Sequence, residues 1–476
     1  MTLGTRRIIY LSFITIFLLI GAILMFYANG YRWNIKKWKI DKVGVLFLTS
    51  KQSNISLYLD DKLQTEKIQN GNLSLRNILP GEYLVRAEKE NHLPWQKKLV
   101  ISSGRTTFTE DIVLFQKSLP TRLASGAISQ FNLSSDRQKI VYSIAKEDAT
   151  DVLLIDLKTK KSSLLYQSQK NDTLEINDWS PSGEKIIINI KKGGKNNYLV
   201  LNTTNPDEVL FLSGFKKAGA EGDTHEKFIG WGFNEVGWQN KNNLYGLIAN
   251  QLYEINLEKK EVSPIAELKI GSNDKINDYL IDGQDIYYLK TDELNSYIVK
   301  IDNQTIFQIK LEKSPNYEFI PNNEKFLIIL DKQREVLQII TKTNFENIAL
   351  EAANKKLIIN LSAKGAFWRP NSDELLYYND YEIIIFNPRT NEKQIVGRYG
   401  EKIKTAAWHS TFQYIIVLLD NKILALEIYG RDKNIFDLAE LPNADNFEIN
   451  DLGTKLFIFS TTGEQEELSE LIIQGE

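Results

Sequence analysis

The chain has 476 residues, of which 42% are hydrophobic, and its formal net charge is −3. This length allows two or three domains with a sizeable core, and the weakly acidic balance, without a basic face, argues against nucleic acid as a main partner. No cysteine is present, which excludes a disulfide scaffold and thiol chemistry.

The N-terminal region contains one long apolar segment. After a short tail, 1–7, residues 8–27 read "IIYLSFITIFLLIGAILMFY" without a charge, which is long enough to cross a bilayer as a helix. No small-residue cleavage site follows, so an uncleaved transmembrane helix is predicted rather than a signal peptide. Residues 28–43 are predicted to be a juxtamembrane linker with interfacial anchors. These anchors are Tyr31, Trp33, Lys36, Lys37, Trp38 and Lys39.

Residues 44–115 form the next unit. Two strands are predicted within "VGVLFLTSKQSNISLYLDDKLQ" and three more between "LRNILPGEYLVRA" and "TEDIVLF". The run Pro80-Gly81-Glu82-Tyr83 is a turn that leads into a strand. This pattern resembles the PEGA domain, a small β-sandwich named for a Pro-Glu-Gly-Ala-like turn. The resemblance implies a spacer or adhesion-type module without catalytic residues, often placed beside a membrane helix on bacterial and archaeal surface proteins.

A repeat follows the second unit. In "NDWSPSGEKIIINI", 177–190, a tight turn at Ser180–Gly183 separates Trp179 from a β-branched strand. Similar units recur at spacings of 40 to 59 residues, compared with ~40–45 residues for a propeller blade. The units are aligned on Leu133, Trp179, Trp238, Tyr279, Phe319, Trp368, Trp408 and Ile449.

Each interval has room for two further strands, which predicts an all-β propeller over 121–476. Eight aligned units favour eight blades, and seven remain possible if the Tyr279 unit is not a blade. The last unit holds about three strands, so "TRLAS" at 121–125 is expected to supply the fourth and close the ring. These units resemble the WD-like β-propeller repeats of bacterial cell-envelope proteins, which implies a fold and not an activity.

The recurring tryptophans raise the question of packing or binding. Trp179, Trp368 and Trp408 occupy a periodic position, where a large aromatic side chain normally fills the space between neighbouring blades. Stacking against a ligand is the alternative. We therefore expect all three side chains to belong to the core.

One interval is longer than the repeat requires. Residues 211–238 contain six glycines and no clear strand before the end. Insertions in propellers map to loops, so this segment is either a tolerated insertion or a partner-binding rim. In the second case the candidate contacts are Lys216, Lys217, Trp231 and Phe233.

The search for catalytic and metal sites identifies no motif. The three histidines, His92, His225 and His409, fall in different units, and His409 is expected to be a solvated turn residue. Asp278, Asp282 and Asp285 lack the spacing of a calcium loop. No nucleophile elbow, phosphate loop or dinucleotide fingerprint is present. The sequence therefore predicts no catalytic motif, cofactor or metal.

The flanking charges and the two resemblances together predict the membrane orientation and the function. The cations Arg32, Lys36, Lys37 and Lys39 favour leaving the large domain in the cytoplasm, but long domains translocate largely regardless of flanking charge. Because both resemblances point to envelope proteins, we expect the C-terminal domains to lie outside the cytoplasm. The predicted function is a membrane-anchored cell-envelope interaction or scaffold protein, with the lipid bilayer and a protein or cell-surface polymer as partners. The alternative is a propeller-channel hydrolase acting on carbohydrate or peptide, which needs acidic residues that converge on the inner strands.

Overall fold

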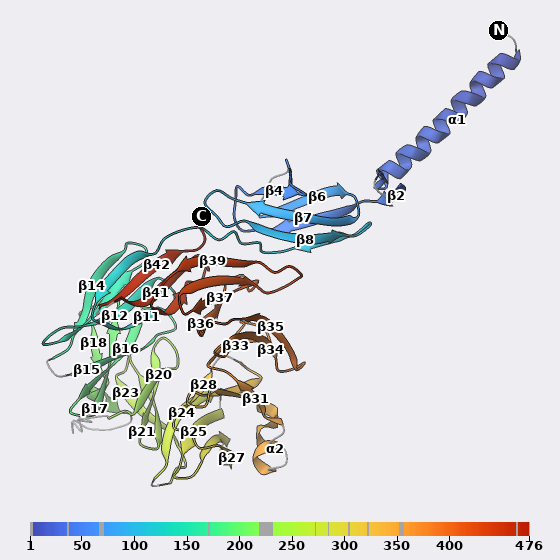
Figure 1. The fold of residues 1–476 in the computed structure, drawn as a ribbon. Coiled ribbons are helices and arrows are strands. Elements are labelled where there is room, and N and C mark those ends of the chain that lie inside the picture. Colours follow the sequence, from blue (N-terminus) through green and yellow to red (C-terminus); the bar gives the residue numbers. More distant parts are fainter. Residues whose placement is uncertain are drawn as a thin grey trace.

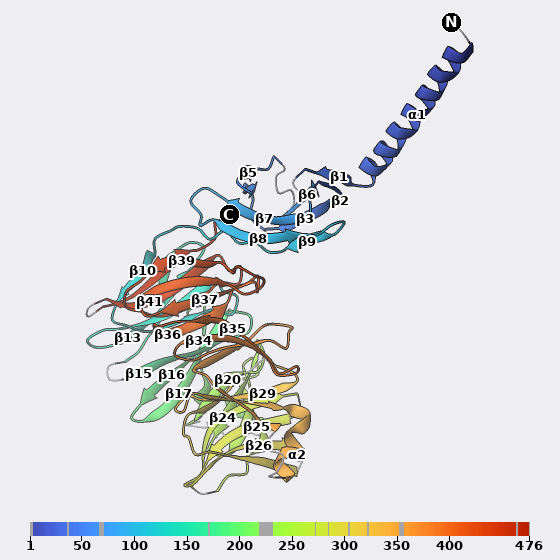
Figure 2. The same cartoon turned by 45° about the vertical axis from the view of Figure 1, so that its right-hand side comes forward.

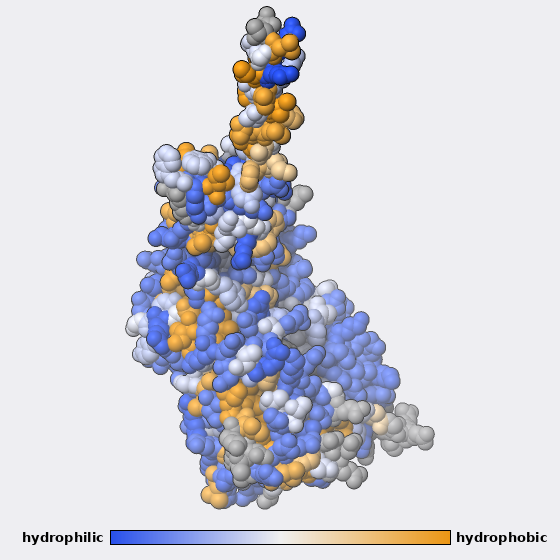
Figure 3. All heavy atoms as spheres, turned by 90° about the vertical axis from the view of Figure 1, so that its right-hand side faces the viewer, coloured by the Kyte–Doolittle hydropathy of each residue, from blue (hydrophilic) through white to orange (hydrophobic). Residues whose placement is uncertain are grey.

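The computed structural model describes residues 3–35, 38–65, 71–169, 172–218, 232–271, 273–283, 285–302, 305–320, 323–351, 357–462 and 465–475. These residues form a protruding helix, a small unit of two sheets and a ring of sheets (Figure 1). Helix α1 (Leu3–Ala28) contains the predicted span 8–27 and begins five residues before it. None of its residues is buried, and it is long and apolar enough to cross a membrane. Hydrophobic side chains cover much of this helix on the face seen in Figure 3.

The predicted linker contains a β-hairpin. Strands β1 (Tyr31–Asn34) and β2 (Lys39–Lys42) pair directly after α1. The Arg32 guanidinium lies 3.5 Å from the ring centroid of Tyr27 and donates a 2.6 Å hydrogen bond to the Tyr27 carbonyl, so the hairpin is fixed to the end of the helix. Trp33 and Trp38 are exposed and meet edge to face, with 6.1 Å between ring centroids. Lys36 and Lys37 lie outside the described residues.

Two small sheets follow the hairpin. One contains β3 (Gly44–Thr49), β6 (Asn72–Ile78) and β9 (Thr106–Thr109), and the other contains β4 (Ser56–Leu59), β5 (Lys62–Leu63), β7 (Gly81–Glu88) and β8 (Trp95–Ile101). Strands β3 and β9 are parallel, and the other pairings are antiparallel. The structure thus has seven strands where the sequence predicts five, because strands as short as β5 carry too few residues to show alternation.

The described residues from 121 onward form eight sheets, seven of four strands and one of five. The first three are β11 (Ile128–Leu133), β12 (Lys139–Ala145), β13 (Thr150–Asp156) and β14 (Lys161–Gln167); β15 (Thr173–Trp179), β16 (Lys185–Lys192), β17 (Lys195–Asn202) and β18 (Val209–Phe211); and β20 (Glu235–Trp238), β21 (Asn243–Ile248), β22 (Gln251–Asn256) and β23 (Glu261–Glu267), joined by β19 (Lys216–Lys217). The next three are β24 (Lys275–Asp282), β25 (Asp285–Thr291), β26 (Ser296–Asp302) and β27 (Thr305–Leu311); β28 (Tyr317–Ile320), β29 (Phe326–Asp331), β30 (Val336–Thr341) and β31 (Ile359–Ser362); and β32 (Gly365–Trp368), β33 (Leu375–Tyr378), β34 (Glu382–Asn387) and β35 (Glu392–Arg398). The last two are β36 (Ile403–Trp408), β37 (Tyr414–Leu419), β38 (Lys422–Glu427) and β39 (Ile435–Glu440); and β10 (Thr121–Gly126) with β40 (Ala444–Ile449), β41 (Lys455–Thr462) and β42 (Gln465–Ile472).

The sheets follow one another around a ring, as Figures 1 and 2 show, and this arrangement is a β-propeller. The ring closes where β10 pairs antiparallel with β42 near the C-terminal end. The predicted role of 121–125 as the closing strand is therefore confirmed. A short 3₁₀ turn (Lys342–Asn344) and helix α2 (Phe345–Leu350) follow β30, and a second 3₁₀ turn (Leu212–Gly214) follows β18.

The recurring aromatic residues pack between sheets, as predicted. Trp179 is 3% exposed and shares a hydrophobic cluster with Val141, Val152 and Leu154 of the preceding sheet. Its indole Nε1–H donates a 3.3 Å hydrogen bond to the Asn132 carbonyl of that sheet. Trp408 donates in the same way to the Phe367 carbonyl at 3.0 Å. Trp368 instead stacks on Phe326 of the preceding sheet, with 5.9 Å between ring centroids.

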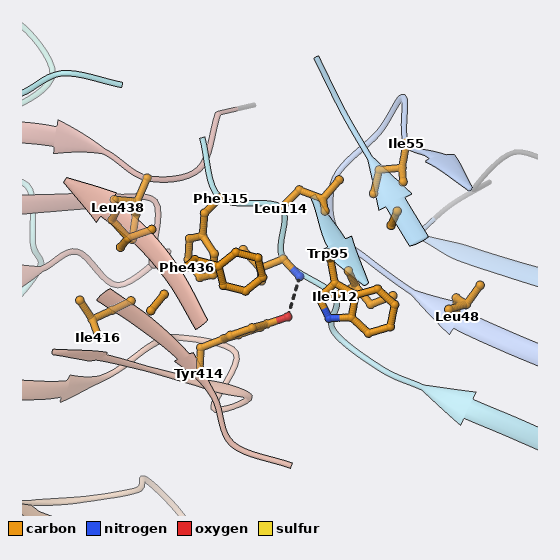
Figure 4. Close-up of a cluster of buried hydrophobic side chains, with 14 of the residues drawn as sticks. Leu48, Ile55, Trp95, Ile112, Leu114, Phe115, Tyr414, Ile416, Phe436 and Leu438 are labelled. Atoms are coloured by element: carbon orange, nitrogen blue, oxygen red, sulfur yellow. Dashed lines mark hydrogen bonds between the residues drawn. The ribbon is translucent and has the colours of Figure 1, made fainter. Parts of the chain in front are cut away.

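The two-sheet unit and the ring share one hydrophobic core. The cluster includes Leu48 and Trp95 from the two-sheet unit and Tyr414 and Phe436 from the ring. Phe115 lies between them, with its ring centroid 5.3 Å from that of Tyr414 and 5.2 Å from that of Phe436 (Figure 4). The Val113 amide donates a 3.2 Å hydrogen bond to the Tyr414 hydroxyl. The hydrophobic core is therefore continuous across the two units.

Polar contacts reinforce this junction. The Lys97 ammonium of β8 lies 2.7 Å from the Glu427 carboxylate of β38, and both side chains are almost completely buried. Lys97 also donates to the Tyr429 carbonyl at 2.9 Å. The backbone and side-chain amides of Asn434 donate to the second Glu427 oxygen at 3.0 and 2.8 Å. Both charges are therefore paired and hydrogen-bonded, as buried ions require.

We predict that Lys97→Met weakens this junction. The substitution keeps the apolar stem but leaves the Glu427 carboxylate without its cation, and the two Asn434 bonds offset only part of the loss. We expect the free energy of unfolding to fall by about 2 to 3 kcal/mol, measured by chemical denaturation. Lys98→Met, one residue along on the exposed face of β8, is the matched control and should change stability little. Equal effects for the two variants would contradict the prediction.

Candidate functional site at the centre of the ring

The first strand of each sheet lies on the inside of the ring; in the closing sheet this strand is β40, and β10 lies at the opposite edge. Successive first strands contact one another, as β11 does β15, β24 does β28, and β36 does β40. Residues that follow one another around these strands are therefore brought together although they are about 40 or more residues apart in sequence. The inner strands are where convergent acidic residues would support catalysis.

Several carboxylates do lie on these strands. Asp278 of β24 accepts a 2.7 Å hydrogen bond from its neighbour's amide, that of Tyr279, and a second of 2.7 Å from the Phe319 amide of β28. It thereby bridges two sheets. Glu448 of β40 lies 3.2 Å from Arg137, which belongs to the turn between β11 and β12. The remaining inner-strand carboxylates include Glu175, Asp178, Glu235 and Glu318.

Two of these carboxylates have strongly shifted pKa values. Burial raises the pKa of Glu235 to about 7, and the charge of Asp278 on the next sheet adds to the shift. Burial also raises the pKa of Asp278 to about 6, with the Glu318 charge acting in the same direction and the two backbone amides opposing it. The pKa of the Tyr279 hydroxyl is raised by burial and then by the charges of Glu235 and Asp278. The pKa values of both carboxyl groups thus lie well above the ordinary values for carboxylates.

A hollow of about 710 Å³ borders Glu235, and Asp278 is not among its lining residues. It is bordered by Glu235 and by residues of the neighbouring sheet, among them Asp274, Lys275 and Asn277. A carboxyl group whose pKa lies near 7 can donate or accept a proton, which is the requirement for general acid or base catalysis. Glu235, at the border of the hollow, therefore has the raised pKa that such catalysis requires. Among the described residues, no group of acidic and histidine side chains is arranged to hold a metal ion.

We predict a specific pH dependence for Glu235. Its folded pKa of about 7 lies above the ordinary value of 4.5, so its burial favours the protonated form. Its contribution to stability is complete below about pH 4.5 and is lost as the pH rises through 7. Glu235→Gln should therefore stabilise the protein by about 1 to 2 kcal/mol at pH 8 and change little at pH 4.5. Thermal melts across this range test it, with the exposed Glu401→Gln as control; a pH-independent effect would contradict it.

The candidate rim residues occupy different environments. Lys216 and Lys217 are exposed on β19, which pairs parallel with β23. Phe233 is only 1% exposed and packs with Leu212 and Phe215, so its side chain does not lie at the surface, as the partner-binding alternative requires. Its side chain fills the space between two sheets, which the glycine-rich surroundings did not indicate. Trp231 lies outside the described residues, as does His225.

The predicted exposure of His409 is also wrong. The sequence predicts a solvated turn residue, but the side chain is fully buried. Its Nε2 lies 2.9 Å from the Gly453 carbonyl and its Nδ1 lies 3.0 Å from the Thr411 hydroxyl. Burial lowers the pKa of His409 to about 4. Packing against Phe115, more than 290 residues earlier in the chain, explains why local turn chemistry did not reveal this position.

The acidic positions carry a sequence signal of their own. Asp178, Asp278, Glu318 and Glu448 each stand immediately before an aligned anchor of the repeat. Side chains alternate between the two faces of a strand, so a residue next to a packed anchor points elsewhere. The periodic alignment could therefore have identified these carboxylates. Their pKa shifts could not be identified in this way, because they arise from burial and from charges on neighbouring sheets.

No family model and no curated protein sequence matches the chain. Among solved structures, the Dos1 propeller matches 75% of this chain and 96% of its own at 9% identity, with a TM-score of 0.48. The C-terminal WD40 domain of Sif2 covers 75% and 99% at 12% identity and a TM-score of 0.46. An oligogalacturonate lyase from Vibrio parahaemolyticus covers 74% and 98% at 10% identity and a TM-score of 0.40.

Proposed function

We propose that the chain is a membrane-anchored interaction or scaffold protein of the cell envelope that presents an eight-bladed β-propeller as a binding platform. The observation that carries this proposal is the exposed apolar helix α1, joined through a hairpin to a body that ends in the ring. An apolar helix of this length can span the hydrocarbon core of a bilayer. The exposed Trp33 and Trp38 next to it suit the membrane interface.

In this proposal residues 44–115 are a PEGA-like β-sandwich, and the ring lies outside the cytoplasm. The core shared by the sandwich and the ring favours a rigid mount over a loose spacer. A rigid connection would hold the propeller in a fixed orientation relative to the bilayer. A protein or a cell-surface polymer is the proposed partner.

Single-cysteine labelling tests the anchor and its orientation, because the chain has no cysteine of its own. Lys259→Cys places a thiol at an exposed turn of the ring, and Gly4→Cys places one at the other end of α1. A membrane-impermeant maleimide should label the first in intact cells and the second only after permeabilisation. The reverse pattern would show a cytoplasmic ring. Extraction of the protein from membranes by alkaline carbonate would contradict the anchor itself.

Photo-crosslinking tests the binding role. Leu294 and Leu452 are 78% and 74% exposed in turns that join second to third and first to second strands, so they lie on opposite faces of the ring. A photoreactive residue at one of these positions should give a discrete heavier product in intact cells. The absence of a product from both faces, while labelling shows correct insertion, would contradict an interaction platform.

A propeller hydrolase is the second candidate, favoured by the Glu235 and Asp278 pair. Its substrate class would be a carbohydrate or peptide. The test compares the wild type with Glu235→Gln and Asp278→Asn on chromogenic glycosides and on labelled casein. Turnover that both variants lose while still folding would support hydrolysis. Equal turnover by all three proteins, or none, would overturn it.

A further inference from the structure

A groove of about 810 Å³ lies between the two-sheet unit and the ring. On the side of the two-sheet unit it is lined by residues 97–100 of β8 and by 108–110, which begin on β9. On the ring side it is lined by Arg369, Gln413, Glu427 and residues 429–431. In Figure 1, β8 is the strand of the two-sheet unit nearest to the ring. The groove is thus bordered by two units that share a core.

Open strand edges face this groove. β8 is the last strand of its sheet, and β9 is the last strand of the other. Four consecutive residues of β8 line the groove, whereas consecutive side chains point to opposite faces of a strand. The groove therefore follows the edge of β8 and not one of its faces. An edge strand presents backbone groups that can pair with another chain.

The backbone of β8 has one open position along this edge. The Gln96 amide bonds the Asn434 side chain at 3.4 Å, and the Val100 carbonyl accepts a 2.9 Å hydrogen bond from Thr107. Both groups point away from β7. By the alternation of an antiparallel ladder, the amide and carbonyl of Lys98 point the same way. Lys98 therefore offers one donor and one acceptor to a segment in the groove.

The groove also has an apolar surface. Val100 is 59% exposed and Phe108 is 61% exposed, although both are large hydrophobic side chains. Phe108 rests against Phe47, with 5.7 Å between ring centroids, so its position is defined. The exposed pair provides a place where apolar side chains of a bound strand can pack.

The charges around the groove are mainly positive. Lys98 and Arg431 are exposed, and neither forms an ion pair within the described part of the chain. Lys97 is paired with Glu427, and Arg369 is paired with Glu374. Glu110 is the remaining carboxylate of the lining. An acidic partner complements this surface.

We infer that the groove binds an extended acidic peptide segment of a partner protein, which pairs with the open edge of β8 and packs apolar side chains against Val100 and Phe108. This mode is β-strand addition, in which backbone bonds give affinity and alternate side chains give specificity. The inference rests on the proposed interaction role and adds to it a surface and a class of partner.

A designed peptide tests the inference directly. The probe is a fluorescein-labelled heptapeptide of alternating valine and glutamate, and the protein is the full chain in lipid nanodiscs. Fluorescence anisotropy should show binding, and the valine–lysine peptide should not bind. The double variant Lys98→Glu/Arg431→Glu should weaken binding at least tenfold. Charge reversal at two turn lysines, Lys158→Glu/Lys259→Glu, is the matched control and should leave binding unchanged.

Two further arms separate strand addition from simple charge attraction. Methylation of the peptide's central backbone nitrogens should abolish binding, because it removes the hydrogen bonds to β8. Phe108→Ser should weaken binding at least tenfold, and Val100→Ser provides the same test if Phe108→Ser lowers the melting temperature. No binding to the wild type, or equal binding by the charge-reversed protein or the methylated peptide, would overturn the inference. Crosslinking through Leu294 or Leu452 in that case would leave the interaction role standing.

Discussion

Removal of residues 465–476 is expected to unfold the whole ring. Strand β42 pairs with β41 on one side and with β10 on the other, so its loss opens the closure. The side chains of Leu468, Leu471 and Ile473 are each at most 1% exposed. Losing a buried aliphatic side chain costs about 2 to 5 kcal/mol, and three such losses approach the total stability of many domains, roughly 5 to 15 kcal/mol. Circular dichroism should show that the cooperative thermal transition is lost or strongly lowered.

The truncation should also loosen the two-sheet unit. The Gln116 amide donates a 2.8 Å hydrogen bond to the Ile473 carbonyl, and Ile473 belongs to the core that joins the two units. Limited proteolysis should therefore cut both units sooner in the truncated protein. Gln465→Ala, on an exposed position of β42, controls for a change of sequence in the strand. An unaltered melting temperature for the truncated protein would show that closure does not stabilise the ring.

Trp179→Ala is expected to have the largest effect among single substitutions considered. The side chain is buried between two sheets, and removing it leaves a cavity as well as the Asn132 carbonyl without its donor. The expected cost is about 3 to 5 kcal/mol, measured by denaturant unfolding. A ligand-stacking role would instead leave stability nearly constant while binding fell.

Trp368→Ala is the matched control for this prediction. Trp368 occupies the same position of the repeat, but it is only partly buried, and its indole nitrogen has no hydrogen-bond partner among the described residues. Its loss should therefore cost less than that of Trp179. Trp179→Phe should recover most of the stability, because it restores the packing but not the hydrogen bond. If Trp368→Ala lowers the free energy of unfolding more than Trp179→Ala does, burial between sheets does not explain why tryptophan recurs at this position of the repeat.

The ring could be predicted because its determinants are local. Each unit combines a turn with suitable residues, such as Ser180–Gly183, and an apolar strand after it. Gly183 has a φ of +68°, which a glycine adopts without strain. The closing strand was also predictable, because the last unit was one strand short. Repetition then turned a set of weak local signals into an architecture.

The junction and the centre of the ring could not be predicted in the same way. The pairing of Lys97 with Glu427 joins residues 330 positions apart, and no local pattern marks a lysine that will be buried. The pKa values of Glu235 and Asp278 depend on the packing of two sheets against each other. The sequence shows that both residues are acidic, but it does not show this environment. The sequence offers Phe233 as a candidate surface contact because it lies in a glycine-rich insertion, whereas its burial is decided by the neighbouring sheet that it packs against.

The closure of the ring by β10 and β42 has a consequence for biosynthesis. The β10 segment emerges from the ribosome early, but its partner strand emerges only after all seven intervening sheets. Until then β10 has no partner strand, and the core around Phe115 lacks residues such as Ile458, Leu471 and Ile473. The nascent chain therefore passes through a long period in which neither unit is complete. A chaperone that shields exposed strand edges would act during this interval, before the last residues convert an open array into a closed one.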